Sequence, residues 1–445
     1  MFNKILIANR GEIAVRIIRT CRELGIKTVA VYSQADRTAL HAQIADEAIC
    51  IGSPATKDSY LNSKAILAAC EISKAEAIHP GFGFLSENSD FAKLCEKCGI
   101  TFIGPSAEAM SAMGNKSNAK QTMKEADVPV IPGSDGVVNS LEEAKQIAEK
   151  IGFPLMVKAS SGGGGRGIRL VEKADDFENA IISAKQEALS FFGNDDIYIE
   201  KFLINPRHVE IQLLADNYGN TVHLGERDCS LQRRNQKLIE ESPSPIMTQD
   251  LRKKMGDAAV RAAKACNYSN AGTIEFLVDE DKNFYFMEMN TRIQVEHPVT
   301  ELITGIDLIA EQIKIAAGEK LEFTQGDIKI LGHAIECRIN AENPDQKFRP
   351  CPGKIKSLHM PGGLGVRIDS AVYQGYEISP FYDSMIAKLI VHAPTREKAV
   401  KKIQVALGEF LVEGIDTNID FQLKLIRDKD FEKGNYDIGF INRKY

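Results

Sequence analysis

The chain has 445 residues, of which 44% are hydrophobic and 26% are charged, as in an ordinary soluble globular protein. This length predicts two or three domains rather than one hydrophobic core. The net charge of -6 argues against a nucleic-acid partner, whose binding surface would normally be basic. We expect no signal peptide and no membrane span. Nine cysteines without a disulfide framework indicate reduced thiols and a cytoplasmic protein.

The first region of the chain alternates between buried apolar runs and amphipathic runs. Strands are predicted at residues 4–9, 27–32 and 75–80, with helices at residues 11–25 and 59–74 between them. Such β-α-β alternation predicts a parallel, doubly wound sheet. The first turn after a strand lacks the glycine fingerprint of dinucleotide-binding proteins, so this fold does not by itself predict a nucleotide there.

A Pro- and Gly-rich linker at residues 128–136 marks a boundary. A smaller unit follows, with helices predicted at 140–152 and about 175–190, and strands at 154–159, 167–171 and 196–202. The chain is then rich in strands, and its last part has short strands and turns and ends in a predicted helix at 395–410. We expect domains at residues 1–112, 113–330 and 331–445, with a small mobile lid at about 131–203.

Residues 160–167 include four consecutive glycines between two predicted strands. Because glycine has no Cβ, backbone amides in such a loop can approach a polyanion closely. A P-loop would instead connect a strand to a helix and end in Gly-Lys-Ser/Thr. We interpret the loop as a lid over phosphates, with Lys158 aimed at the same phosphates. A flexible linker is the structural alternative.

Residues 286–298 read "FMEMNTRIQVEHP" and alternate between apolar and polar side chains, as an extended strand does. The polar positions are Glu288, Asn290, Arg292, Gln294 and Glu296. If the strand stays extended to Glu296, two carboxylates, two amides and an arginine share one face. An ordinary exposed face is a less selective mixture of polar residues, so this pattern predicts the floor of an active site.

The strand before this one closes a predicted hairpin. If residue 280 faces residue 283 across the turn, then Glu275 faces Glu288. Like charges placed so repel each other, and partial burial strengthens the repulsion. A divalent cation such as Mg²⁺, which prefers carboxylate oxygens, would make the pair favourable, and Asn290 could add a third oxygen. A solvent-facing pair with lysine partners is the structural alternative.

The other polar positions predict the handling of a small anion. The planar guanidinium of Arg292 suits a carboxylate-like anion, and Glu296 beside a bound acid is a candidate general base. The run at residues 226–241 alternates in charge sign and is most simply a solvated surface. With an anionic substrate nearby, Arg233, Arg234 and Lys237 would instead raise its local concentration.

Five stretches together resemble the biotin carboxylase family of the ATP-grasp superfamily, in one register over the whole chain: "ILIANRGEIAVRI", "HPGFGFLSEN", "KASSGGGGRG", "ERDCSLQRRNQK" and "EMNTRIQVEHPVTE". The resemblance implies an α/β fold with a Rossmann-like N-terminal domain, an ATP-grasp region with a small mobile lid, and a C-terminal α+β domain. It also implies that ATP phosphorylates bicarbonate to carboxyphosphate, and that the resulting carbon dioxide is captured by N1′ of a carrier-linked biotin.

The resemblance assigns roles to individual residues. ATP would be bound by Lys116, Lys158, Gly164, Gly165, Glu200, Lys201, Leu203, His208, Gln232, Leu277, Met287 and Ile438. Mg²⁺ or Mn²⁺, at two expected sites, would be held by Glu275, Glu288 and Asn290. Bicarbonate would be bound by Lys237, Arg292, Gln294, the Val295 amide and Glu296, with Glu296 as the base. Arg338 would stabilise the enolate-like ureido oxygen of biotin, whose entrance would be lined by Phe82, Arg16, Arg367 and Asp383. Arg19, Glu23 and Arg367 would lie near a two-fold dimer interface.

Two positions depart from the family pattern. Asn235 stands where His is frequent, which puts one nucleotide contact in doubt, and Phe82 stands where Tyr is common, which removes a hydroxyl near biotin. The carrier motif Ala/Val-Met-Lys-Met does not occur in the chain. We therefore expect a stand-alone subunit of acetyl-CoA carboxylase in fatty-acid synthesis. Its partners would be a biotin carboxyl carrier protein, carboxyltransferase subunits and a second copy of this chain.

Three alternatives remain at this point. A pyruvate- or propionyl-CoA-directed complex could use the same biotin carboxylase chemistry. Another ATP-grasp ligase, joining an acyl phosphate to an amine or thiol, would share the lysines and metal-binding glutamates but would not need Arg292, Glu296 and Arg338 together. A nucleotide-binding regulator without catalysis should lack at least one of the metal, anion or base residues, and none is missing.

Overall fold

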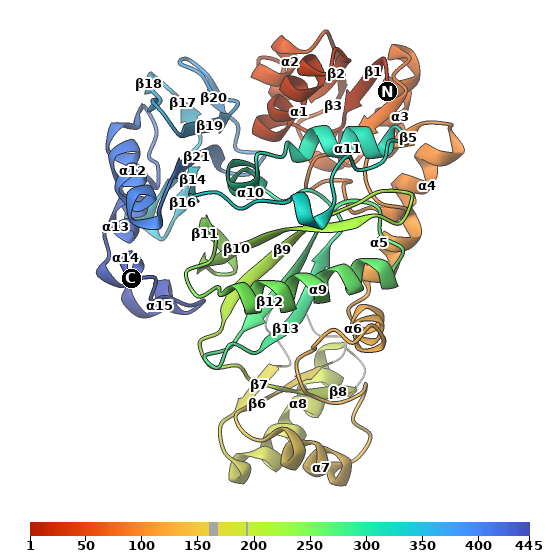
Figure 1. The fold of residues 1–445 in the computed structure, drawn as a ribbon, viewed down its shortest axis with the longest axis vertical. Coiled ribbons are helices and arrows are strands. Elements are labelled where there is room, and N and C mark those ends of the chain that lie inside the picture. The colour runs from red at the N-terminus through yellow and green to blue at the C-terminus, as the bar shows by residue number, and fades with distance from the viewer. Residues whose placement is uncertain (160–167, 193–194) are drawn as a thin grey trace.

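The N-terminal region forms a parallel sheet with helices around it (Figure 1). The structure, a computed structural model, describes residues 1–159, 168–192 and 195–445. The sheet order is β3 (Glu47–Gly52), β2 (Lys27–Ser33), β1 (Lys4–Ile7), β4 (Ala77–His79) and β5 (Thr101–Phe102), all pairs parallel. The flanking helices are α1 (Gly11–Glu23), α2 (Leu40–Ile44), α3 (Ser63–Ser73) and α4 (Ser89–Lys97). The predicted doubly wound sheet is confirmed.

Helix α1 shows why this region folds as it does. Its apolar residues recur with helical spacing, and Ile13, Ile17 and Cys21 are all buried in one cluster with Ile5 and Ile7 of β1. After Lys4, strand β1 is an uninterrupted and fully buried apolar run, as expected for a strand covered on both faces.

The small unit, which contains the strands and helices between Leu141 and Lys201, lies at the bottom of the molecule in Figure 1. It has an antiparallel sheet ordered β7 (Ile168–Val171), β6 (Leu155–Ala159) and β8 (Ile197–Lys201), with helices α7 (Leu141–Ile151) and α8 (Phe177–Phe192). It has its own apolar core, centred on Leu155, Val157 and Phe177. The glycine loop at residues 160–167 lies outside the described residues.

An eight-stranded sheet forms the body of the molecule. Its order is β13 (Phe284–Asn290), β12 (Asn270–Val278), β9 (Arg207–Ala215), β10 (Thr221–Arg233), β11 (Gln236–Ser242), β14 (His333–Asn340), β21 (Met385–Ala393) and β19 (Val366–Ser370). Helix α9 (Gln249–Ala265) covers β9 and β10 through an alanine-rich buried face. Helices α5 (Ala107–Gly114) and α6 (Lys116–Glu125) connect the parallel sheet to this body. Strands from the predicted central and C-terminal regions therefore share one sheet.

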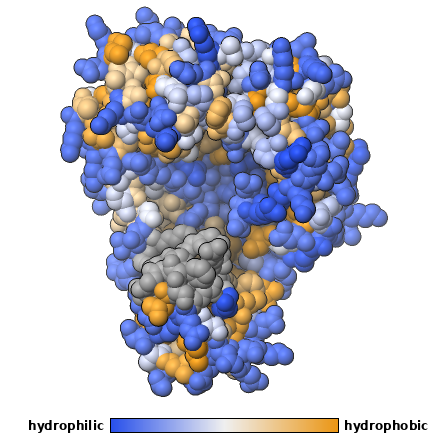
Figure 2. Space-filling model, turned by 180° about the vertical axis from the view of Figure 1, so that it is seen from behind, coloured by the Kyte–Doolittle hydropathy of each residue, from blue (hydrophilic) through white to orange (hydrophobic). Residues whose placement is uncertain are grey.

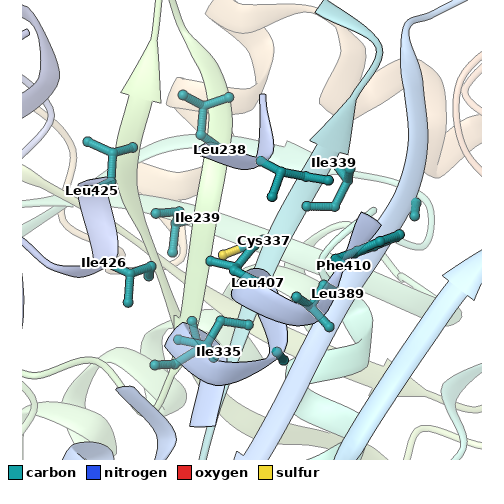
Figure 3. Close-up of a cluster of buried hydrophobic side chains, with 14 of the residues drawn as sticks. Leu238, Ile239, Ile335, Cys337, Ile339, Leu389, Leu407, Phe410, Leu425 and Ile426 are labelled. Carbon is teal, nitrogen blue, oxygen red and sulfur yellow. The ribbon is translucent and has the colours of Figure 1, made fainter. Parts of the chain in front are cut away.

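The C-terminal part packs its helices on one face of β14 and β21. Figure 3 shows Ile335, Cys337 and Ile339 pointing toward side chains of the C-terminal segment, among them Leu407, Leu425 and Ile426 from its helices and Phe410 from just after one of them. The helix predicted at 395–410 is α12 (Arg396–Glu409). The prediction that the chain ends in this helix is wrong, because α13 (Ile419–Ile426), α14 (Lys429–Glu432) and α15 (Phe440–Lys444) follow it.

The opposite face of this sheet carries two further helices and the polar residues of the site. Helix α10 (His297–Thr304) packs Val299 and Ile303 against Ala334 and Ile390, and α11 (Leu308–Ala316) lies beside α1. Short two-stranded sheets complete the region: β15 (Glu342–Asn343) with β16 (Arg349–Pro350), β17 (Gly353–Lys354) with β20 (Glu377–Ile378), and β18 (Ser357–His359) with β22 (Leu411–Glu413). Among the helices of the described residues, none has both the length and the apolar composition needed to cross a membrane.

Candidate active site

The hairpin of β12 and β13 brings the two predicted metal-binding glutamates together. Glu275 and Glu288 are direct cross-strand partners, as predicted. The predicted turn, with residue 280 opposite residue 283, is wrong, because Val278 pairs with Phe284 and the tip is one residue out of register. A bulge between Glu275 and Phe276 compensates for that shift.

Glu275 is buried and has several polar partners. Its Oε1 accepts hydrogen bonds from Asn290 Nδ2 and Gln294 Nε2, both at 2.9 Å, and from Lys237 Nζ at 3.0 Å. Its Oε2 lies 3.1 Å from His208 Nε2. Burial opposes the charged form, but Lys237 and His208 outweigh it and hold the pKa of Glu275 well below its usual range. Lys237 and His208 therefore offset part of the negative charge of Glu275 that we expected a metal cation to offset.

The predicted strand does not continue to Glu296, and that expectation is wrong. Strand β13 ends at Asn290, because Glu87 takes the next groups: its carboxylate accepts from Thr291 N at 3.1 Å and Arg292 Nε at 2.9 Å. Glu296 instead precedes the first residue of α10. The turn into this helix still directs Gln294 and Glu296 toward the same centre.

Glu296 is fully buried between two cations. Its Oε1 accepts from Lys237 Nζ at 2.6 Å and its Oε2 from Arg338 Nη2 at 3.0 Å. Burial would raise the pKa of Glu296, but Lys237, Arg338 and Arg227 together lower it below its ordinary value. The carboxylate is therefore ionised at neutral pH and able to accept a proton.

Lys237 is the point at which the site's carboxylates meet. Besides Glu275 and Glu296, its Nζ donates to Glu210 Oε2 at 2.7 Å. These three carboxylates raise the pKa of Lys237 well above its ordinary value against the effect of burial. The surface interpretation of residues 226–241 is thus wrong for Lys237 and for most of the run, because Glu226, Arg227, Asp228, Glu240 and Glu241 are buried. It holds for Arg234, which is exposed.

Sequence reasoning did not assign a role to Arg227. This side chain is fully buried and donates to Glu210 Oε1 at 2.5 Å and to Gln212 Oε1 at 2.7 Å. It thereby fixes the carboxylate that also holds Lys237. The signal that could have found it was the alternation of His208, Glu210 and Gln212 along one predicted strand.

Arg292 and Arg338, which were predicted for the anion and for biotin, also lie at this centre. Arg292 Nη2 donates to Asn290 Oδ1 at 3.0 Å. Arg338 Nε donates to Glu240 Oε1 at 2.6 Å, and Glu240 was not predicted. Arg338, Lys237 and Glu296 therefore come from β14, β11 and the start of α10, segments far apart in the chain.

Residues assigned to ATP are divided between the small unit and the sheet. Glu200 on β8 accepts from Lys158 Nζ at 2.6 Å and from Lys120 Nζ at 3.0 Å, and Lys120 was not predicted. Gln232 Nε2 lies 2.7 Å from His208 Nδ1. The remaining positions are Lys201 and Leu203 at and after the end of β8, Leu277 on β12, Met287 on β13, and Ile438, whose amide bonds to Pro206 O at 3.1 Å. Lys116 is the first residue of α6, and Gly164 and Gly165 lie outside the described residues.

Of the residues assigned to biotin and to a dimer, Arg16, Arg19 and Glu23 lie on α1, and Arg367 lies on β19, which packs against α1. Arg16 Nη2 and Arg367 Nη1 bind the two oxygens of Glu301 at 2.9 and 2.7 Å, so both arginines are tied within the chain. Phe82 is half-buried and Asp383 is exposed. Arg19 and Glu23 are exposed, one turn apart on α1.

The donor set on the hairpin fits a hard divalent cation. Glu275 and Glu288 face each other across two strands, and Asn290 contributes an amide on the same strand as Glu288. The lowered pKa of Glu275 keeps it ionised at neutral pH. Oxygen ligands of this kind suit Mg²⁺ or Mn²⁺. Figure 2, seen from behind, shows a recess with a largely hydrophilic lining above the small unit, as charged ligands would require.

Three protein families match successive parts of the chain. Residues 1–110 match the biotin carboxylase N-terminal domain, and residues 336–443 match the biotin carboxylase C-terminal domain. Between them, residues 115–324 match the ATP-binding domain of the carbamoyl-phosphate synthase L chain.

Individual relatives cover the whole length. Biotin carboxylase 1 of Bacillus subtilis is 58% identical over 442 residues, which are 99% of this chain and 98% of the relative. A pyruvate carboxylase subunit of Methanothermobacter thermautotrophicus is 55% identical, over 99% of this chain and 90% of the relative. A solved dimer of the biotin carboxylase domain of Hydrogenobacter thermophilus 2-oxoglutarate carboxylase, in complex with MgADP, ADP and bicarbonate, superposes with a TM-score of 0.89. It is 51% identical and covers 100% of this chain and 98% of that one.

Proposed function

Because the chain belongs to the biotin carboxylase family, it is an ATP-dependent ligase that carboxylates biotin, and we propose that its substrate is the biotin of a separate carrier protein. The observation that carries this proposal is the ionised, buried Glu296 between Lys237 and Arg338. This group lies beside the cross-strand pair Glu275 and Glu288. A base, an anion site and a metal-phosphate site are thus adjacent.

The proposed first step is the activation of bicarbonate. Lys237, Arg292, Gln294 and the Val295 amide bind the anion, and Glu296 takes its proton. The deprotonated oxygen then attacks the γ-phosphorus of ATP, which gives carboxyphosphate and ADP. The cations that lower the pKa of Glu296 in the free site would pair partly with the bound anion, and Glu296 then becomes a stronger base.

ATP is proposed to lie between the small unit and the sheet. Lys116, Lys158 and the amides of Gly164 and Gly165 bind its phosphates, and the other assigned ATP residues hold its base and ribose. Glu275, Glu288 and Asn290 would hold Mg²⁺ or Mn²⁺. A divalent ion bound there would neutralise phosphate charge and orient the γ-phosphate.

The second step is proposed to be capture of carbon dioxide by biotin. Carboxyphosphate first breaks its carbon–oxygen bond and gives carbon dioxide and phosphate, and that phosphate accepts the N1′ proton. Arg338 stabilises the negative charge that develops on the ureido oxygen as N1′ loses its proton and attacks the carbon dioxide. Phe82, Arg16, Arg367 and Asp383 are proposed to line the entrance for biotin. The common attachment of Arg16 and Arg367 to Glu301 supports a single location for these two.

We propose that the subunit serves acetyl-CoA carboxylase in the cytoplasm, as a homodimer with carrier and carboxyltransferase partners. The domains are proposed at residues 1–112, 113–330 and 331–445, with the lid at about 131–203. A pyruvate- or propionyl-CoA-directed complex is the alternative. It is retained because one relative of similar identity is a pyruvate carboxylase subunit. Co-purification from the native host and identification of the biotinylated partner distinguishes these complexes.

The first test is the dependence of ATP cleavage on bicarbonate. Purified protein with Mg²⁺, free biotin and bicarbonate should release phosphate from ATP, and omission of bicarbonate should largely abolish the release. If ATP turnover ignored bicarbonate but responded to an added amine, the chain would instead be a carboxylate-amine ligase.

The second test separates the two steps at Arg338. Arg338→Gln removes the cation proposed for biotin but leaves Lys237 and Arg292 in the anion site. Biotin carboxylation should therefore fall much further than bicarbonate-dependent ATP cleavage, when both rates are measured on the same preparation. Equal losses in both reactions would refute the role of Arg338 toward biotin.

A further inference from the structure

Two glutamates that the proposed mechanism does not use lie directly behind Arg338. Glu240 on β11 and Glu336 on β14 are cross-strand partners, and both are fully buried. Among the described residues, Glu240 Oε2 and both carboxylate oxygens of Glu336 accept no hydrogen bond. Ionising two buried carboxylates that face each other costs much free energy, so one of them tends to keep its proton.

The two members of this acid pair are not equivalent. Glu240 Oε1 accepts from Arg338 Nε at 2.6 Å, whereas Glu336 has no ion pair within the part of the chain that the structure describes. Arg338 in turn reaches Glu296 at 3.0 Å through Nη2. A line of contacts therefore runs from Glu240 through the guanidinium to the base of the proposed reaction.

The surroundings explain which glutamate carries the charge. Glu336 lies between the sheet and α10, on the same face of β14 as Arg338. The charged groups that act on the acid pair are Arg338 on β14, Lys388 on β21, Lys237 on β11 and Glu296 at the start of α10. Lys237 and Lys388 are already shared with other carboxylates, Lys237 with Glu210 and Glu275 and Lys388 with Glu12 and Asp369. Negative charge thus exceeds positive charge here, which favours a proton on one acid.

We propose that Glu240 is a positioning residue that orients Arg338 for the biotin step, and that Glu336 opposite it stays protonated so that Glu240 keeps the negative charge. The inference rests on the proposed role of Arg338 and adds the group that aims it. Burial raises the pKa of Glu336 well above its ordinary value, and burial raises the pKa of Glu240 to about 7 although Arg338 opposes the rise.

The pH dependence follows from these values. Glu240 holds Arg338 as an anion, and its ionised fraction falls as the pH drops through its pKa of about 7. The rate of biotin carboxylation divided by the rate of bicarbonate-dependent ATP cleavage should therefore decline below that pH. Because both rates come from one preparation, the ratio cancels differences in the amount of folded enzyme.

Glu240→Gln is the main variant, and Glu336→Gln is its matched control. The amide oxygen introduced by Glu240→Gln can still accept from Arg338, so only the charge is lost. The ratio should drop by ~10- to 100-fold, as for a misplaced reacting group, and should no longer change with pH around 7. Glu336→Gln makes the same chemical change in an equally buried partner that is already neutral, and should keep both the ratio and its acidic decline.

Each outcome decides the inference. A proportional fall of both rates in Glu240→Gln, or the same loss of ratio and pH dependence in Glu336→Gln, would overturn it. If Glu240→Gln does not fold by circular dichroism, Glu240→Asp provides the test, because it keeps the charge and should keep the acidic decline. A folded Glu240→Asp enzyme without that decline would also overturn the inference. If Arg338→Gln shows no difference between the two reactions, the proposed function of Arg338 fails instead.

Discussion

At the residue scale, Glu296 shows how a fully buried carboxylate can stay ionised, as the proposed role of a base requires. It is held by Lys237 at 2.6 Å and by Arg338 at 3.0 Å, and these cations keep it ionised despite complete burial. The same contacts make it a weak base in the free site. A substrate anion that recruits those cations would thus raise its basicity at the moment when a proton must be taken.

Glu296→Gln should lower bicarbonate-dependent ATP cleavage by ~10²–10⁴-fold, the usual contribution of a positioned base. The amide keeps the shape of the side chain but takes no proton. Glu311→Gln is a suitable control, because Glu311 is also buried and paired with a lysine, yet lies on α11 away from the proposed chemistry. A near-normal rate in Glu296→Gln would show that another group is the base.

The residues of the site were predictable to different degrees. The cross-strand pairing of Glu275 with Glu288 could be predicted from the hairpin. The predicted turn was wrong by one residue, and a bulge in the hairpin compensates for that error. The contacts of Lys237 with three glutamates could not be predicted, because these glutamates belong to segments separated by tens of residues. Local periodicity contains no information about such distant contacts.

At the element scale, the connection from β13 to α10 determines where the site's polar groups point. This segment is irregular, and its geometry depends on partners from elsewhere in the fold. Lys388 Nζ is fully buried and donates to Val295 O at 2.9 Å, while lying 3.2 Å from Glu12 Oε1 on α1. His297 Nδ1 lies 2.7 Å from Gln294 O.

Lys388→Met should destabilise the protein by ~3–5 kcal/mol, because it leaves Glu12 buried without its cation. The free energy of unfolding can be measured by denaturant titration. Lys401→Met, on the exposed side of α12, should change it by no more than ~0.5 kcal/mol. Adding Glu12→Gln to Lys388→Met should recover part of the loss, and additive effects of the two changes would contradict the proposed pairing.

Elements were predicted well where they are local and poorly where they depend on distant pairing. In the parallel sheet, β1, β2 and β4 and the helices α1 and α3 followed from apolar periodicity alone, whereas the edge strands β3 and β5 were not predicted. The eight-stranded sheet joins β11 to β14 across about ninety residues, and no local pattern specifies that pairing. The end of β13 at Asn290 depends on Glu87, which belongs to the N-terminal region.

At the scale of the whole molecule, the fold places the small unit, the central sheet and the N-terminal region around a polar recess (Figure 2). The linker contacts both the sheet and the small unit, since Val130 bridges to Phe286 and Gly133 to Glu200. Glu200 also binds Lys158 and Lys120. Movement of the small unit would therefore carry proposed adenine- and phosphate-binding groups together.

The exposed outer face of α1 is the proposed two-fold interface. Arg19 and Glu23 are one turn apart, and among the described residues neither has an ion-pair partner within the chain. In a two-fold interface the same patch faces itself, so Arg19 of one copy can meet Glu23 of the other. The charges would then be complementary only in the dimer.

Arg19→Glu should therefore weaken the dimer, because like charges across an interface cost up to several kcal/mol. Sedimentation velocity over a range of concentrations measures the shift toward monomer. The charge-swapped double variant Arg19→Glu with Glu23→Arg should restore dimers, since the two-fold axis recreates the opposite-charge pair in reversed order. Lys93→Glu on the exposed face of α4 is the control and should not alter association. If Arg19→Glu dimerises like the unaltered chain, or the double variant remains monomeric, this face of α1 is not the interface.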